Sequence, residues 1–136
     1  MHIHQDVSFE ATPEAIYDVL VSAAKFAKMT GGRKATITAK AGGAISLFDG
    51  YISGRNLELV PGKRIVQAWR AKEWPEGVHS IVRFELSKRG KGAALAFDQI
   101  GHPENHHDHL AEGWVKMYWE PMKALLKGAP KGGEAA

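Results

Sequence analysis

The region from residue 34 to residue 100 constrains the fold most, because it is a series of short alternating segments separated by tight turns. Asp49-Gly50 and Pro61-Gly62-Lys63 are typical turn sequences, since glycine accepts positive φ and proline fixes φ. Strands joined by turns this short pair as antiparallel neighbours. We therefore expect an antiparallel meander. Its predicted strands cover residues 35–38, 45–48, 51–60, 65–72, 78–87 and 93–100.

The segment before the meander predicts one more strand and two short helices. Residues 3–9 alternate between apolar and polar side chains, as a half-buried strand does. Thr12 can cap a helix that has Pro13 at its first position. Ser22 can cap a second helix, and Gly31-Gly32 would end it.

The last segment predicts a long amphipathic helix. Its apolar face holds Leu110, Trp114, Met117, Pro121 and Leu125. Its charged face holds Glu112, Lys116, Glu120, Lys123 and Lys127. Pro121 lacks a backbone donor and should bend this helix. Residues 129–136 are small or charged, and we expect them to form a disordered tail.

The composition predicts one globular domain over residues 1–128. The chain has 136 residues, of which 44% are hydrophobic and 24% charged. It has no apolar run of the roughly 18 to 20 residues that a membrane-spanning helix needs. It also has no cysteine, which excludes disulfides, thiolate metal sites and thiol nucleophiles, and which is typical of a cytoplasmic chain.

The charges and the histidines indicate neither nucleic acid nor a metal as a partner. The 18 Lys and Arg residues exceed the 15 Asp and Glu residues by only 3 and are scattered along the chain. Four histidines precede the last helix: His102, His106, His107 and His109. Two more, His2 and His4, lie at the N-terminal end, around the start of the first predicted strand. Zinc needs three or four ligands, and no spacing here fixes a further one, so we expect no metal.

The order strand, two helices, meander and long helix is typical of an α+β domain whose helix covers one sheet face. A sheet twisted around one helix leaves a concave, mostly apolar space between them, which is the candidate binding site. The predicted lining residues are Phe48, Trp69, Phe84, Phe97, Trp114, Met117 and Tyr118. The alternative, which the sequence leaves open, is that these side chains simply fill the core.

Two separated motifs also carry a family resemblance. Residues 50–70 read GYISGRNLELVPGKRIVQAWR, and the closing region contains GHPE at 101–104, EGW at 112–114 and YWEP at 118–121. Together they resemble the activator of heat-shock-protein ATPase homologue family, within the START-like SRPBCC superfamily. The resemblance spans about residues 3 to 127. It implies a helix-grip (START/Bet v-like) fold, in which a curved antiparallel sheet of about six strands wraps around the C-terminal helix.

The resemblance also implies three functional hypotheses. The leading one is a non-catalytic protein that binds a small hydrophobic molecule in the cavity between sheet and helix, without a cofactor. The second is a chaperone-associated interaction domain, because this domain forms the C-terminal half of the eukaryotic activator and follows a separate N-terminal domain that this sequence lacks. The third is a cyclase-like enzyme that uses Arg70, Asp98 or Tyr118 in the same cavity. The chain could be a monomer or a homodimer.

Overall fold

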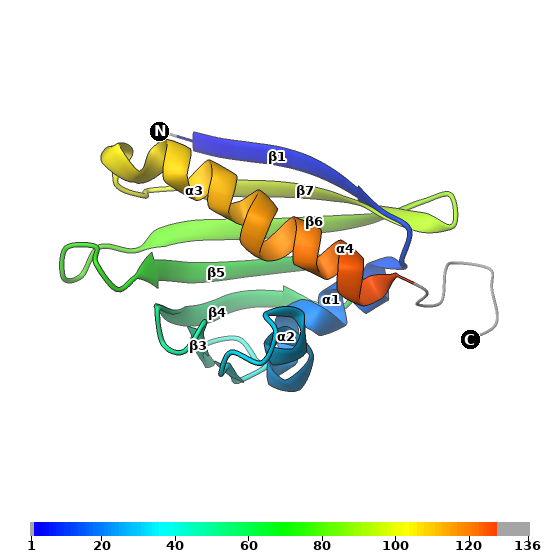
Figure 1. Ribbon diagram of the computed structural model, residues 1–136, viewed down its shortest axis with the longest axis horizontal. Helices are drawn as coiled ribbons and strands as arrows, with labels where there is room; N and C mark the ends of the chain where they lie inside the picture. The colour runs from blue at the N-terminus through cyan, green and yellow to red at the C-terminus, as the bar shows by residue number, and fades with distance from the viewer. Residues whose placement is uncertain (1, 128–136) are drawn as a thin grey trace.

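Residues 2–127, which the computed structural model describes, form one seven-stranded sheet crossed by a long C-terminal helix (Figure 1). The strands are β1 (His2–Phe9), β2 (Thr36–Ile37), β3 (Ala44–Leu47), β4 (Ile52–Val60), β5 (Arg64–Ala71), β6 (Ser80–Arg89) and β7 (Gly92–Ile100). Their order in the sheet is β1-β7-β6-β5-β4-β3-β2, and every neighbouring pair is antiparallel. The predicted α+β class and antiparallel meander are confirmed.

Alternation along each strand gives the sheet one buried and one outward face. In β7 the side chains of Leu95, Phe97 and Gln99 are buried, whereas Ala96 and Asp98 lie on the other face and are partly exposed. Strands β2 to β7 pair with their neighbours along the chain, but β1 pairs with β7 across most of the sequence. The first strand is therefore an edge of the sheet, next to the last strand.

Helices α1 (Pro13–Val21) and α2 (Ala23–Met29) begin at the predicted caps. The Thr12 side chain accepts a hydrogen bond from the Ala15 N–H at 3.2 Å, and the Ser22 side chain accepts one from the Lys25 N–H at 3.2 Å. Each cap satisfies one of the backbone donors that a helix start leaves unpaired. Both helices lie near the end of the C-terminal helix and contact it there (Figure 1).

The C-terminal helix is continuous but changes its winding in the middle. It comprises η1 (Glu104–His106), α3 (His107–Trp114), the π-helical η2 (Val115–Trp119) and α4 (Glu120–Leu126). The Glu120 N–H bonds the Val115 carbonyl, five residues back. Pro121 cannot donate to Met117, and its ring would clash with that carbonyl in a regular α-helix, so the wider turn relieves the conflict. The irregularity predicted at Pro121 is thus a π segment just before it.

The core lies between this helix and the buried face of the sheet. Phe97 packs against Trp114 with ring centroids 4.2 Å apart, and against Phe84 at 5.3 Å and Trp119 at 5.3 Å. Met122, one turn further along the helix, is fully buried. The middle of the sheet is therefore covered by closely packed aromatic rings.

Within residues 2–127, no helix has the length and apolar character needed to cross a membrane. The predicted tail, residues 129–136, lies outside the described residues.

Candidate functional site

A pocket of about 510 Å³ opens beside α3 and η2, over the ends of β4 and β5. Its apolar walls are Phe48, Ile52, Trp69, Ala71, Trp74, Leu110, Trp114 and Met117, with Gly113 among them. Its charged and polar margin is Arg33, Tyr51, Glu73, His106, His109, Glu112 and Lys116. The pocket thus combines an apolar interior with a margin that carries both positively and negatively charged side chains.

The structure divides the predicted lining residues into two groups. Phe48, Trp69, Trp114 and Met117 line the pocket. The other three lie beyond its wall in the aromatic core and are buried: Phe84, Phe97 and Tyr118. Four of the seven predicted residues therefore line the pocket, and the other three fill the core.

Sequence reasoning missed several walls of the pocket, above all Trp74. This residue lies in the loop between β5 and β6, where no alternation or helical period marks a side chain as inward. Arg70 holds that loop in place. Its guanidinium donates to the backbone carbonyls of Trp74 at 2.8 Å, Pro75 at 3.0 Å and Val78 at 3.3 Å. Arg70 therefore supports the pocket wall from the outward face of the sheet.

The two indoles on the C-terminal helix that contact Phe97 both have glutamine acceptors, of which Gln99 is buried and Gln5 partly buried. The Trp114 Nε1–H donates to Gln99 Oε1 at 2.8 Å, and the Trp119 Nε1–H donates to Gln5 Oε1 at 2.6 Å. Gln99 in turn donates from Nε2 to the buried Ser80 hydroxyl at 3.0 Å. Each glutamine therefore satisfies an indole that would otherwise be buried without an acceptor.

The two indoles contributed by the sheet side of the pocket are less well satisfied. The Trp69 Nε1–H donates to the Tyr118 hydroxyl at the long distance of 3.4 Å. Burial raises the pKa of Tyr118 well above its ordinary value, so this hydroxyl stays neutral. The Trp74 Nε1–H is buried and has no hydrogen-bond acceptor among the described residues. Trp74 is thus a pocket wall with an unused donor.

A hydrogen-bonded pair marks one side of the pocket mouth. The Tyr51 hydroxyl donates to the Glu73 carboxylate. Desolvation, followed by this bond, raises the pKa of Tyr51 to about 12, and the same bond lowers the pKa of Glu73. Tyr51 is therefore neutral and Glu73 charged near pH 7. Elsewhere on the pocket margin, Lys116 on η2 forms an ion pair with Glu112 on α3, and the distance from Nζ to Oε1 is 2.5 Å.

The three residues that would carry cyclase-like chemistry do not meet in this pocket. Arg70 and Asp98 occupy outward-facing strand positions, on the side of the sheet away from the helix, whereas Tyr118 is buried beneath the helix. General acid–base catalysis needs groups that converge on one substrate. These three residues do not form such a set.

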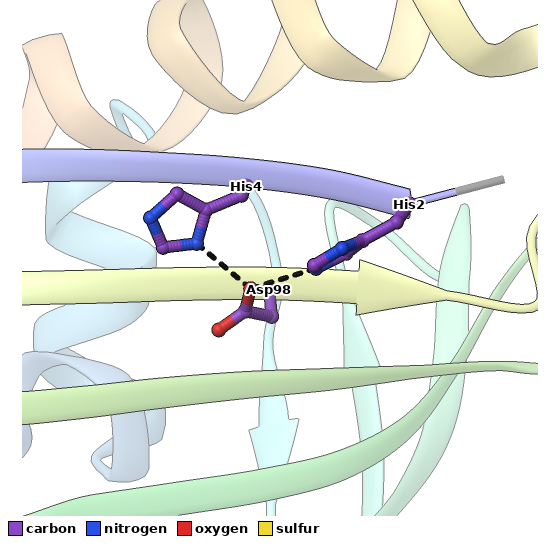
Figure 2. Close-up of side chains that lie close together, drawn as sticks. All are labelled: His2, His4 and Asp98. Carbon is purple, nitrogen blue, oxygen red and sulfur yellow. Dashed lines mark hydrogen bonds and ion pairs between the residues drawn. The ribbon is translucent and has the colours of Figure 1, made fainter.

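Six of the seven histidines fall into three places. The rings of His102 and His107 stack, and His102 Nε2 lies 2.9 Å from His107 Nδ1. Burial, followed by the charge of His107, lowers the pKa of His102. His106 and His109 belong to the pocket margin. On the opposite face of the sheet His2 and His4 meet Asp98, a contact that the spacing of the sequence did not reveal (Figure 2).

A curved antiparallel sheet wrapped around a long C-terminal helix, with two short helices after the first strand, defines the helix-grip class of START-like α+β domains. The chain spans one such domain over most of its length. It belongs to the "Activator of Hsp90 ATPase homolog 1-like protein" family, whose model matches residues 10–127. The predicted family is confirmed.

Relatives of known name agree with this assignment. The chain is 31% identical over 116 residues to the human activator of 90 kDa heat shock protein ATPase homolog 1, covering 85% of the chain and 34% of that protein. It is 34% identical over 124 residues to the Dictyostelium discoideum homolog, covering 90% of the chain and 32% of that protein. The chain therefore spans about a third of the length of these relatives.

Solved structures share the fold. An HSP90 activator from Plasmodium falciparum superposes with a TM-score of 0.88 at 24% identity, covering 96% of this chain and 99% of the other. The Aha1 dimer from Colwellia psychrerythraea gives a TM-score of 0.78 at 21% identity, covering 95% and 98%. At these identities the likeness shows the fold alone.

Proposed function

We propose that the pocket beside α3 and η2 binds a small, mostly apolar molecule that carries a hydrogen-bond acceptor. The volume of about 510 Å³ falls within the range of roughly 300 to 1,000 Å³ that is typical of small-molecule sites. Aromatic walls such as Trp69 and Trp114 favour an apolar body. Charges of both signs at the mouth favour a neutral or weakly polar end over a highly charged one.

The unpaired indole of Trp74 is the observation that carries this proposal. A buried donor without an acceptor costs about 1–3 kcal/mol, and the other three indole donors of the chain each have one. A carbonyl, ether or hydroxyl oxygen of a bound molecule would satisfy Trp74 Nε1–H once the indole turns this buried atom toward the pocket. The proposed ligand is therefore an apolar compound with such an oxygen.

Gly113 offers a way to close the pocket without disturbing the core. It lies in the wall on α3, and a Cβ built on it would meet no atom within 4 Å. Gly113→Leu should place its side chain in the pocket. Ala124→Leu, at an exposed position on α4 outside the pocket, is the matched control for adding leucine to the same helix.

Native mass spectrometry of the purified chain, with extraction and identification of apolar compounds, tests the proposal. We expect the wild type and Ala124→Leu to retain a compound that contains an acceptor oxygen, and Gly113→Leu to lose it while keeping its far-UV circular dichroism spectrum. A Gly113→Leu variant that holds the same compound at the same occupancy would contradict the pocket as the site.

Association with a chaperone is the second candidate function. Its support is family membership and the names of the relatives, which are activators of the 90 kDa heat shock protein ATPase matched over about a third of their length. A surface-mediated effect on the ATPase rate of a purified chaperone should be equal for the wild type and Gly113→Leu. An effect that disappears with the filled pocket would instead link the two functions. Either role suits a cytoplasmic protein.

A further inference from the structure

Three side chains of residue types that can ligate metals, His2, His4 and Asp98, converge on the outward face of the sheet, away from the pocket (Figure 2). His4 on β1 lies directly across from Asp98 on β7, and His2 precedes it by two residues on the same face. The His2 Nε2 is 2.7 Å and the His4 Nδ1 is 2.8 Å from the same Asp98 Oδ1 atom. One ligand atom from each residue lies within 4.8 Å of the other two.

The position of Asp98 in the sheet fixes its carboxylate. Strand β7 lies between β1 and β6, so Asp98 has His4 as its cross-strand neighbour on one side and Arg83 on the other. Arg83 Nη2 donates to Asp98 Oδ2 at 2.9 Å, which leaves Oδ1 directed at the two imidazoles. The Asp98 side chain is 14% exposed, whereas those of His2 and His4 are 55% and 47% exposed. An ion can therefore reach the cluster while its carboxylate stays in place.

A second carboxylate orients the imidazole of His4. The His4 Nε2 lies 3.0 Å from Asp6 Oδ2, so a proton on Nε2 is held there, and Nδ1 becomes a ligand when it gives up the proton that it shares with Asp98. Metal-binding histidines characteristically donate their other N–H to a carboxylate or carbonyl in this way. Asp6 and Arg83 thus occupy the supporting positions of a metal site.

We propose that His2 Nε2, His4 Nδ1 and Asp98 Oδ1 bind a first-row divalent metal ion such as Zn²⁺. Two imidazole nitrogens and one carboxylate oxygen are a common set of three protein ligands for zinc, with water in the fourth position. Ligand bonds of about 2.0–2.1 Å place neighbouring ligand atoms about 3.3 Å apart, so the exposed rings must withdraw by about 0.5 Å. The ion takes the place of the imidazole protons that face Asp98, and these leave to solvent.

The open fourth position would face an accessible surface. His2 and Asp98 also line a depression of about 500 Å³ on the outward sheet face. Water or a small ligand can approach the ion from there. This site lies on the other side of the sheet from the apolar pocket, and it does not depend on the function proposed for that pocket.

Titration of the 136-residue chain with ZnCl₂ by isothermal calorimetry tests the proposal, and the visible absorption of bound Co²⁺ reports the ligand set. We expect one ion per chain, at least tenfold weaker binding for His4→Gln and for Asp98→Asn, and about tenfold weaker binding for Asp6→Asn, because the loss of a supporting carboxylate typically costs 10- to 100-fold. His107→Gln removes a histidine from a different cluster and should bind as the wild type does.

Three results would overturn the proposal. One is Zn²⁺ affinity in His4→Gln equal to that of the wild type. Another is loss of binding in His107→Gln, which would assign the ion to the His102–His107 pair. The third is the absence of any stoichiometric binding at micromolar protein, which would leave His2, His4 and Asp98 as a hydrogen-bonded cluster only. Circular dichroism of each variant separates loss of binding from loss of fold.

Discussion

The two ends of the C-terminal helix cover the sheet in different ways. From the middle of the helix to the α4 end, Phe97, Trp119 and Met122 fill the space, and α1 and α2 contact α4. At the α3 end, a pocket of about 510 Å³ remains between the helix and the ends of β4 and β5. The same helix and the same sheet therefore produce a close-packed core at one end and an open site at the other.

The hydrogen bonds of the tryptophans follow the same division. On the helix, Trp114 and Trp119 each donate to a glutamine on the sheet. Across the pocket, Trp74 has no acceptor within the described part of the chain. The packed region is complete in itself, whereas the open region has an unsatisfied donor and unfilled volume. Both features distinguish the pocket from the packed region.

The largest effect should come from truncating the packed end. Phe97→Ala removes a ring that contacts Phe84, Trp114 and Trp119, and aromatic-to-alanine changes in a close-packed core cost about 3–5 kcal/mol. Urea unfolding followed by tryptophan fluorescence measures the free energy of unfolding. Met117→Ala at the pocket rim, where Met117 is 41% exposed, should stay within about 0.5 kcal/mol of the wild type.

Equal costs for these two variants would remove the distinction between the ends. A small cost for Phe97→Ala would mean that the aromatic cluster is loosely packed. A large cost for Met117→Ala would mean that the rim is part of the core.

An intermediate difference in stability is expected between two tryptophan-to-phenylalanine substitutions, one at position 114 and one at position 74. Trp114→Phe leaves Gln99 Oε1 without its donor, whereas Trp74→Phe removes a donor that has no acceptor. Both remove similar volume from buried positions. Since a buried polar group left unpaired costs about 1–3 kcal/mol, Trp114→Phe should be the more destabilising change by about that amount in thermal or urea unfolding. Equal losses would show that Trp74 has a partner of comparable strength.

Local sequence signals predicted most of the fold. The caps at Thr12 and Ser22, the meander of strands and the long amphipathic helix all depend on contacts close in sequence, and the structure has each of them. The π segment depends on how one turn accommodates Pro121. A proline predicts that something must change there, but not which geometry relieves it.

The candidate sites were harder to predict because they depend on distant residues. The local sequence pattern around a buried aromatic residue is the same whether its side chain lines a pocket, as that of Trp69 does, or fills the core, as that of Phe97 does. The contact between His4 and Asp98 joins positions 94 residues apart and exists only because β1 pairs with β7. Pairing between strands that are not neighbours along the chain leaves no local signature.

The smallest effect should be a gain in stability at the open end. Gly113 is helical and has free space where a Cβ would go, so Gly113→Ala should raise the free energy of unfolding by about 0.5–1 kcal/mol through helix propensity alone. Gly77, in the loop that carries Trp74, also has free space but has φ near +82°. Gly77→Ala should therefore lower the free energy of unfolding by about 1–2 kcal/mol. Urea unfolding of the two variants should give changes of opposite sign. A destabilised Gly113→Ala would show that the pocket wall has no free space for a methyl group at this position.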